Sequence, residues 1–483
     1  MEFREQKDYW WVLGGIVLIA LVIVALVLNS NVNNLPTSDT SDIKIDNGDE
    51  KIVWEEYPSY NVELTENYMI TAPGTYYLSG KIENGGITVR VVENAAVRLV
   101  LNNVTIKNPT GPAIACFEGD DLVIVVEGED NYLEDASNYD STYDEDVKGV
   151  IYSKADLSFS GGGKLTVKAN YQDGIISKDD LKFSGGTYNI VAVDDGIRGK
   201  DSVYITGGDF SITTKGDAIK STKENDNTKG FVLVRGGKIK ISSGDDAIHA
   251  YNKLIVEGGE IEVLQSYEGL EAQKVIINGG DIKIASNDDG INAGGGSDAA
   301  TSKRPGAFDV NENCELIVNG GKVYINAAGD GVDSNGYIYF NGGEVIVDGP
   351  TSDGNGALDA GAKIVMNGGR VIAVGASGMA EGLGTESAIY NVSIYFGSTL
   401  TKNTKVEIKD DEENVIVSHT SLKTFSHLAA GSPEFKLGET YTIYIDDVKC
   451  QSFTISSVLT TVGRNTQGGP GAGPGNMPGG PRR

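Results

Sequence analysis

Cysteine and histidine are scarce in this sequence, and their scarcity excludes several kinds of site. The 483 residues include three cysteines, Cys116, Cys314 and Cys450, and three histidines. The cysteines are far apart and odd in number, which excludes a disulfide framework and a CxxC zinc site. We interpret them as small buried apolar groups. Three histidines leave little material for Ser–His–Asp catalysis or for a histidine-rich transition-metal site.

Positive charge is scarce as well. The chain carries 40 Lys and Arg residues against 68 Asp and Glu residues, a formal net charge of −28 at pH 7. Such an acidic protein repels polyanions unless a cation lies between them, so we exclude nucleic acid as a partner. Hydrophobic residues make up 40% of the chain, which is enough to build a core. Glycine is abundant, with 64 residues, and predicts many tight turns.

One long apolar run lies near the N-terminus. Residues 10–28 carry no charge over 19 positions, which is long enough to span most of a bilayer as a helix. No small-residue cleavage pattern follows this run, and Arg4 and Lys7 precede it. We therefore predict an uncleaved transmembrane helix, a single pass through the cell membrane and a body outside the cell.

The body of the chain repeats a short unit built around a pair of glycines. Alternating apolar residues flank each pair, as in VIINGGDIKI, and predict two short strands joined by a turn in which glycine takes a positive φ. The first glycines of successive pairs are Gly185, Gly207, Gly236, Gly258, Gly279, Gly320, Gly342 and Gly368. Their separations are 22, 29, 22, 21, 41, 22 and 26 residues, so the period is about 22. Short strands at this period, with no helical stretch in the body, predict an all-β fold, a right-handed parallel β-helix.

The expected organisation follows from these features. We predict a short cytoplasmic N-terminus at 1–9, a transmembrane anchor at 10–28, a flexible linker at 29–50, the β-helix at 51–391, a small antiparallel β cap at 392–460 and a disordered Gly/Pro-rich tail at 461–483.

A second pattern runs in phase with the glycine pairs: an acid, then Gly or Ala, then an aliphatic residue. It recurs from Asp173-Gly-Ile through Asp195-Gly-Ile to Asp330-Gly-Val. We expect the aliphatic residue to lie in the core and the small residue to mark a bend that turns the acid outward. Carboxylates on successive turns, about 4.8 Å apart, would repel one another by roughly 3 kcal/mol, so a bare acidic ladder is implausible.

The residue after each aliphatic divides this acidic column into two halves. In the first half it is Arg198, Lys220 or His249, so that protein cations can neutralise the acids. In the second half further oxygen ligands take that position, and these ligands predict Ca²⁺, which prefers hard oxygen ligands without His or Cys. The candidate metal ligands are Glu268, Glu271, Asp289, Asn292, Asp330 and Asp333, with Asp246, Asp288 and Asp359 at the margins. The alternative is that each acid hydrogen-bonds to turn amides on its own turn while solvent screens the charges.

Residues 148–212 also carry a family resemblance. The combination of GGGKLTV, GIISKDDL and DDGIRGKD resembles the clostridial family of carbohydrate-binding β-helix domains, and the likeness extends over roughly residues 50–460. The resemblance implies a fold similar to that of the pectate-lyase families, bound Ca²⁺ and recognition of cell-wall polysaccharides, either acidic and galacturonan-like or cellulosic. It also implies a saccharide site near the acidic column. The candidate contacts are Arg198, Lys220, His249, Tyr251 and Tyr267, with Tyr171 and Tyr204 as further exposed rings.

Two other functions stay open. A polysaccharide lyase needs a base for the C5 proton of a uronate, and Lys220 or Arg198, beside Asp195 and Asp217, would be that base. Neighbouring carboxylates keep such cations protonated, which makes them poor bases, so we assign no catalytic residue. The other alternative is a surface adhesin or spacer that binds a protein partner. The sequence leaves the oligomeric state open.

Overall fold

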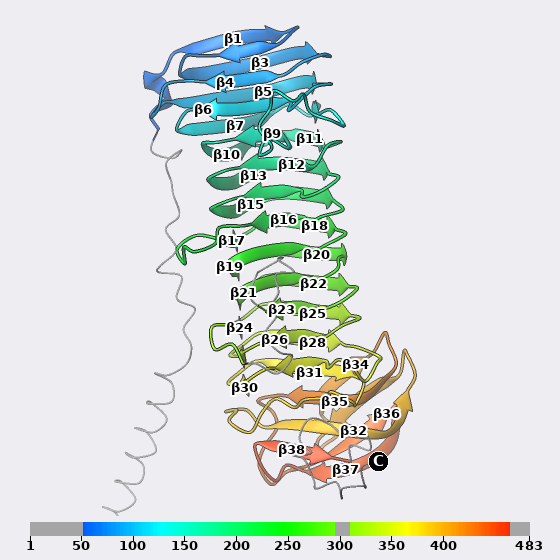
Figure 1. The fold of residues 1–483 in the computed structure, drawn as a ribbon. Helices are drawn as coiled ribbons and strands as arrows, with labels where there is room; N and C mark the ends of the chain where they lie inside the picture. The colour runs from blue at the N-terminus through cyan, green and yellow to red at the C-terminus, as the bar shows by residue number, and fades with distance from the viewer. Residues whose placement is uncertain (1–51, 295–309, 464–483) are drawn as a thin grey trace, which may run out of the picture. The chain divides into compact units, whose positions relative to one another are not determined.

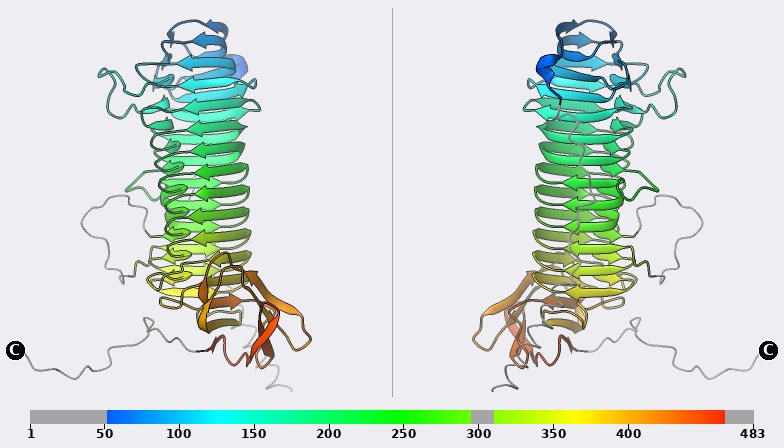
Figure 2. Two further views of the ribbon diagram at one scale, coloured as in Figure 1. Left: turned by 90° about the vertical axis from the view of Figure 1, so that its right-hand side faces the viewer. Right: turned by 90° about the vertical axis from the view of Figure 1, so that its left-hand side faces the viewer.

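The computed structural model describes residues 52–294 and 310–463, and almost all of their regular structure is strand. One short 3-10 helix, η1 (Trp54–Glu56), precedes the first strand. The strands then follow three faces, A, B and C, in turn. Strands of one turn pair in parallel with those of the next, so that successive turns lie one below another (Figures 1 and 2).

Face A contains the first strand segment of each turn. Its strands are β1 (Ser59–Leu64), β3 (Gly74–Ile82), β5 (Ala96–Lys107), β7 (Asp121–Glu127), β10 (Asp156–Gly161), β13 (Asp180–Val191), β15 (Ser202–Thr213), β17 (Phe231–Val234), β19 (Ile248–Val256), β21 (Leu270–Ile277), β24 (Glu315–Val318), β27 (Tyr337–Phe340) and β30 (Lys363–Met366).

Face B follows the glycine turn. It contains the second halves of β3, β5, β13 and β15, together with β8 (Asn131–Glu134), β11 (Lys164–Lys168), β18 (Lys238–Ser242), β20 (Glu260–Gln265), β22 (Asp281–Ser286), β25 (Lys322–Ala327), β28 (Glu344–Asp348) and β31 (Arg370–Gly375).

Face C follows the acidic column and consists mostly of short strands. They are β2 (Tyr68–Ile70), β4 (Ile87–Arg90), β6 (Ile114–Glu118), β9 (Gly149–Ser153), β12 (Asp173–Ser177), β14 (Ile197–Gly199), β16 (Ile219–Ser221), the first residues of β19 and β21, β23 (Ile291–Ala293), β26 (Val332–Ser334) and β29 (Leu358–Ala360).

The three faces enclose one apolar core. The aliphatic residue of the acid-Gly-aliphatic pattern lies in it on every turn, as predicted: Ile197 pairs with Ile219, and Ile219 with Ile248, and all three are fully buried. Inward-facing residues of faces A and B extend the same core, which holds the turns together through apolar burial.

The predicted fold class is wrong as it was stated. We expected a right-handed parallel β-helix behind one transmembrane helix. The described residues form one 34-stranded sheet, parallel except at its C-terminal end, that closes around its core because three strand segments per turn suffice to enclose the apolar interior. The described ranges 52–294 and 310–463 contain no helix long and apolar enough to cross a membrane, which corrects the predicted membrane localisation. Residues 1–50, including the predicted anchor at 10–28, lie outside the described residues, as does nearly all of the tail predicted at 461–483.

The chain from residue 391 onward changes to antiparallel pairing. β35 (Phe425–Gly431) pairs antiparallel with both β31 and β32 (Asn391–Leu400), and β32 pairs in parallel with β38 (Leu459–Val462). A separate antiparallel sheet has the order β34 (Val415–Thr420), β33 (Lys405–Lys409), β36 (Thr440–Ile445) and β37 (Val448–Thr454). This segment has its own core, which includes Phe425, Phe435 and Tyr441.

Asp348, at the end of β28, connects this C-terminal segment to the parallel sheet. Its fully buried carboxylate accepts hydrogen bonds from His419 Nε2 at 2.8 Å, Ser421 Oγ at 2.8 Å and Tyr324 Oη at 2.7 Å. Burial alone would raise the pKa of Asp348, but the bonds from His419 and Tyr324 lower it below its usual value. A charged, fully hydrogen-bonded group therefore joins the two sheets.

The cysteines divide between buried and exposed positions. Cys116 and Cys314 are buried, as predicted, but Cys450 is exposed on β37. Its strand lies at the edge of the four-stranded sheet, and six of the seven residues of that strand are exposed, so the interpretation of Cys450 as a buried group is wrong.

The second glycine of each pair adopts a positive φ, as predicted. Gly237 has a φ of +92°, and a Cβ built on it would lie 2.6 Å from the carbonyl oxygen of Gly208 on the preceding turn. Both the backbone conformation and the close approach of the turns require glycine here.

We expect Gly237→Ala to destabilise the protein by about 1–3 kcal/mol, because alanine is strained at this φ and would contact the neighbouring backbone. Gly162 is the matched control: it is not in the left-handed region, and no atom lies within 4 Å of its built Cβ. Urea denaturation of the two variants compares them directly. Equal stability of Gly237→Ala and Gly162→Ala would contradict the explanation.

Candidate functional site

The residues predicted to form the site lie in one line along face C. Backbone pairing places the following residues in register on successive strands: Ile176, Arg198, Lys220, His249, Glu271, Asn292, Asp333 and Asp359. The acids of the acidic column lie just before these strands, at the corner between faces B and C. The structure thus brings the predicted site residues together.

The acids bond to the backbone of the next turn. Asp195 Oδ1 accepts the N–H of Asp217 at 3.0 Å, and Asp217 Oδ1 accepts that of Asp246 at 2.8 Å. The same bond runs from Asp330 N–H to Asp289 Oδ1 at 2.6 Å. The alternative prediction, that each acid hydrogen-bonds to backbone amides of its own turn, is therefore wrong for Asp195, Asp217 and Asp289. The bend also does not expose the acids of the first half, because Asp195, Asp217 and Asp246 are buried.

Protein cations neutralise the first half of the column, as predicted. Lys220 Nζ lies 2.6 Å from Asp217 Oδ2. Arg198 lies 3.6 Å from Asp195 and 3.4 Å from Asp173. Lys148 adds a further pair, 3.3 Å from the buried carboxylate of Asp173. The sequence analysis missed Lys148 and Asp173 as site residues, although Asp173 carries the same acid-Gly-aliphatic signal.

His249 completes this half and is not a surface group. Only 2% exposed, it places Nδ1 3.2 Å from Asp246 Oδ2 and 2.6 Å from Glu271 Oε2. Burial lowers the pKa of His249, but hydrogen bonds to the two carboxylates outweigh burial and hold that pKa well above its usual value. His249 is thus a buried cation, which corrects its assignment as a saccharide contact.

The second half contains half-buried acids without such cations. Among the described residues, no ion pair joins Glu268, Asp289, Asp330, Asp333 or Asp359 to Lys, Arg or His. Burial, reinforced by the neighbouring carboxylates, raises the pKa of Glu268 to about 9, Asp289 to about 7 and Asp333 to about 8. Burial also raises the pKa of Asp330 to about 6. These carboxyls need either a proton or an external cation.

The geometry of the second half suits a divalent cation. Asp330, Asp333 and Asp359 each offer an oxygen within 4.8 Å of the others. Asn292 donates from Nδ2 to Glu268 Oε2 at 3.0 Å, and its buried Oδ1 has no hydrogen-bond partner within the described part of the chain. Several carboxylates and an unpartnered amide oxygen are the ligands that Ca²⁺ prefers, so these residues fit it. Glu271 and Asp246 lie at the boundary and already contact His249.

Without a bound cation, stability should depend on pH in a defined direction. The folded-state pKa values of Glu268, Asp289, Asp330 and Asp333 are raised above about 4, the value for unfolded carboxyls. Their stabilising contribution is therefore complete below pH 4 and is lost as pH rises through 6 to 9. Melting temperatures in chelator should fall over this range and fall less in Ca²⁺. A flat profile in chelator would contradict the raised pKa values.

The predicted tyrosines differ in accessibility. Tyr267 is 48% exposed beside the acidic column, and Tyr251 is half-buried. Tyr171 is half-buried and stacks on Tyr139, with ring centroids 4.5 Å apart. Tyr204 is only 1% exposed, because its outward-facing ring packs against Phe231 in an apolar cluster on face A. It is therefore wrongly predicted as an exposed ring, and Tyr267 has the most open ring of these four predicted tyrosines.

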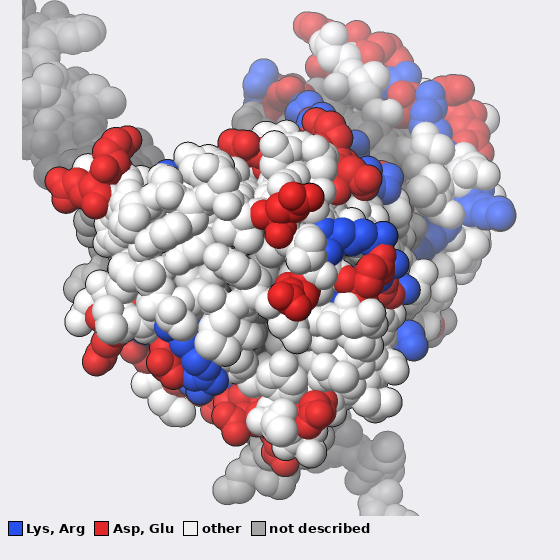
Figure 3. Space-filling view, turned by 90° about the horizontal axis from the view of Figure 1, so that it is seen from above, with Lys and Arg blue, Asp and Glu red and all other residues white. Residues whose placement is uncertain are grey.

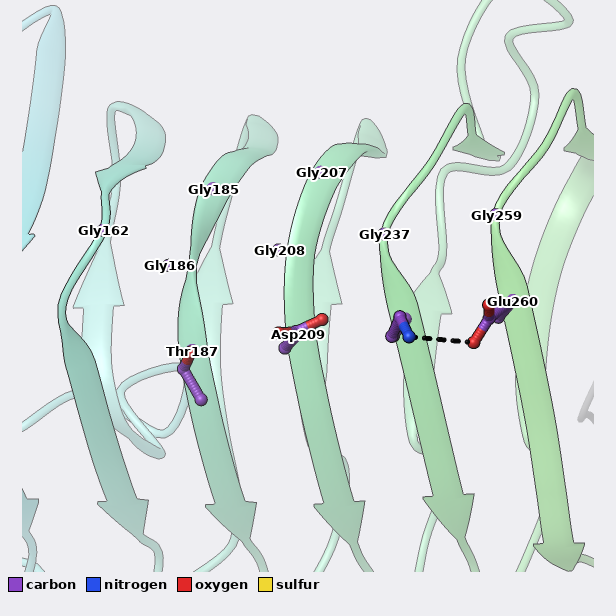
Figure 4. Close-up of a pocket in the computed structure, with 11 residues that line it drawn as sticks. Gly162, Gly185, Gly186, Thr187, Gly207, Gly208, Asp209, Gly237, Gly259 and Glu260 are labelled. Atoms are coloured by element: carbon purple, nitrogen blue, oxygen red, sulfur yellow. Dashed lines mark ion pairs between the residues drawn. The ribbon is translucent and has the colours of Figure 1, made fainter.

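Face B carries grooves that the sequence analysis missed. Glycine pairs form the floor of one groove, of about 530 Å³, with Thr187, Asp209, Lys238 and Glu260 beside it (Figure 4). A second groove, of about 500 Å³, shares these four residues and continues along the outward side of β13, β15, β18 and β20. Lys238 and Glu260 form an ion pair at 3.3 Å. The sequence did contain a signal for these grooves: the four residues are the first after their glycine pairs, and all four are polar.

Face B leads from these glycine turns to the acidic column, so a ligand lying along face B would contact both the grooves and the column.

Two sequence comparisons identify the same kind of domain. A family model described as carbohydrate-binding domain-containing protein matches residues 65–303. A carbohydrate-binding domain-containing protein of Acetivibrio thermocellus is 39% identical over 210 residues, which cover 43% of this chain and 73% of that protein. A solved structure, a gadolinium derivative of the polysaccharide lyase-like protein from C. thermocellum, shares 34% identity and covers 45% of this chain and 84% of its own, with a TM-score of 0.40. The resemblance noted in the sequence is confirmed: this chain belongs to the family of carbohydrate-binding domain-containing proteins.

Proposed function

We propose that this protein binds an acidic polysaccharide through calcium ions held in the second half of the acidic column. Family membership supports carbohydrate binding in general. The observation that carries the calcium requirement is a set of half-buried acids that no protein cation compensates among the described residues: Glu268, Asp289, Asp330, Asp333 and Asp359.

The net charge of −28 makes a bridging cation necessary for an acidic ligand. Ca²⁺ bound by Asp330, Asp333 and Asp359 would supply positive charge to which the carboxylates of a galacturonan-like chain bind. The side chains of Arg198 and Lys148, about a quarter exposed, offer further positive charge in the first half of the column. In the second half, the exposed ring of Tyr267 near Glu268 and Asp288 provides an apolar surface for a sugar ring.

The geometry favours a binding protein over a lyase. Lys220 is the leading candidate for a base, but its side chain is only 12% exposed and it lies 2.6 Å from the buried carboxylate of Asp217. Deprotonation would leave that carboxylate buried without its cation, which is costly. Arg198 likewise pairs with two buried carboxylates, 3.4 Å from Asp173 and 3.6 Å from Asp195. The cations of face C therefore compensate buried acids.

A retention experiment tests this function. The full chain is passed over immobilised polygalacturonate in Ca²⁺ or in chelator, with cellulose as a neutral polymer for comparison, while absorbance reports unsaturated uronate. We expect retention on polygalacturonate in Ca²⁺, loss of retention in chelator and flat absorbance. Rising absorbance would show a lyase. Absence of retention under both conditions would favour an adhesin or spacer that binds a protein.

A further inference from the structure

We propose a second saccharide subsite, selective for a neutral glycan and independent of calcium, in a groove beside Tyr77 on face A. It rests on the proposed carbohydrate binding and lies on a different face from the acidic column. The groove, of about 440 Å³, is large enough for a small ligand.

The register of four strands builds this groove. Asn61 on β1 pairs with Tyr77 on β3, and Tyr77 pairs with Val100 on β5. Beside this row lie Glu63, paired with Ser79, and Asn102, paired with Glu127. All of these side chains are exposed except that of Val100, because they occupy the outward positions of the strands.

Tyr77 gives the groove an apolar surface. Its side chain is 43% exposed, although a tyrosine ring gains much by burial, and it lies between the exposed Asn61 and the buried Val100. The C–H face of a sugar ring would cover this exposed ring. Asn61, Ser79 and Asn102 supply donors and acceptors at its side, as sugar hydroxyls require.

The charges of the groove favour a neutral sugar. The charged residues lining it are Glu63 and Glu127, and its lining includes no Lys or Arg. Their carboxylates accept hydrogen bonds from hydroxyls but repel uronates. The second groove on face B differs, because Lys164, Lys238 and Lys240 line it together with Asp209, Glu260 and Glu262. The groove beside Tyr77 thus carries charge of one sign only, which favours a neutral glycan over an acidic one.

The groove opens toward the end of the sheet. Within the described residues β1 pairs only with β3, so a glycan lying across β3 and β1 meets no further strand of the sheet. Viewed from this end, a broad uncharged area occupies one side of the surface, while acidic and basic groups lie on the other side (Figure 3).

Isothermal titration of the full chain in chelator tests this subsite, with cellohexaose, xylohexaose and mannohexaose as neutral probes. We expect at least one probe to bind, Tyr77→Ala to weaken its binding by about tenfold or more, and Tyr77→Phe to retain it because the ring is preserved. Leu437→Ala, at an exposed apolar residue of the C-terminal segment, is the control and should bind like the wild type. Unchanged melting temperatures would show that the variants fold.

Three results would overturn the proposal: no binding of any probe, unchanged binding by Tyr77→Ala, or binding that requires Ca²⁺. The test is separate from that of the acidic column. Tyr77→Ala should retain calcium-dependent binding to polygalacturonate, so failure at one site leaves the other measurable.

Discussion

Replacing Asp330 and Asp333 by asparagine together should abolish stabilisation of the protein by calcium and lower its calcium-dependent retention on polygalacturonate at least about tenfold. Both carboxylates belong to the cluster of three whose oxygens lie within 4.8 Å of one another. Ca²⁺ affinity depends on the number of charged oxygen ligands, and the variant removes two of them. Calcium at about 100 times its Kd should stabilise the wild type by about 2.7 kcal/mol and the variant by almost nothing.

The same variant should behave oppositely in chelator. Burial and nearby carboxylates raise the pKa of Asp330 and Asp333, so these groups repel one another when charged. Asparagine removes that repulsion at similar volume. We therefore expect the double variant to melt at or above the wild-type temperature in chelator at pH 8. This pattern separates loss of a metal ligand from simple misfolding, which would lower stability under both conditions.

Asp281→Asn is the control for the double variant. Asp281 is an exposed acid on β22, on face B, and its carboxylate lies 3.9 Å from Lys283 at the surface. Its replacement changes the net charge without touching the acidic column, so calcium stabilisation should stay as in the wild type. If Asp330→Asn/Asp333→Asn still gains full stabilisation from calcium, the ions bind elsewhere and the proposed site is wrong.

Lys220→Met should destabilise the protein by about 3–5 kcal/mol, the second large effect that we expect. The variant keeps the apolar stem of the side chain but removes the ammonium group that lies 2.6 Å from Asp217 Oδ2. Asp217 is almost fully buried and also accepts the N–H of Asp246, so its carboxylate cannot turn toward water. An unpaired buried charge then opposes folding.

The matched control is Lys238→Met on face B. Lys238 and Glu260 also form an ion pair, at 3.3 Å, but both side chains are more than 60% exposed. Exposed pairs contribute little, so the free energy of unfolding should change by less than about 1 kcal/mol. Urea denaturation measures both variants. A Lys220→Met protein as stable as the control would show that Lys220 does not compensate Asp217 and would return it to consideration as a base.

The regular period made the line of site residues predictable. Because turns of about 22 residues pair in register, residues at equivalent positions stack, and the spacing of the repeat was enough to align Arg198, Lys220 and His249. The positive φ of the second glycine followed equally from local chemistry, as Gly237 shows. Both conclusions depend only on spacing and on what one residue type permits.

Partners across turns and faces were not predictable in the same way. The sequence placed acids at the corner, but it could not show that Asp195 Oδ1 accepts the amide of Asp217 on the next turn. It likewise predicted Tyr204 as exposed and His249 as a sugar contact, whereas neighbouring turns bury both. Burial depends on the side chains that the adjacent turns bring beside a residue, and a single unit of the repeat does not contain that information.

The amino-acid sequence was therefore sufficient for an all-β repeat, the core position of the aliphatic residues, the two halves of the acidic column and the family resemblance. The folded chain was needed to show how the sheet closes, which acids lack a protein cation, where grooves form beside Tyr77 and along face B, and how Asp348 reaches His419, 71 residues later in the chain. The physical reason is the distance along the chain over which each interaction acts. Repeat spacing and backbone preference are local and can be read along the chain, while desolvation and charge compensation arise from groups that only folding brings together.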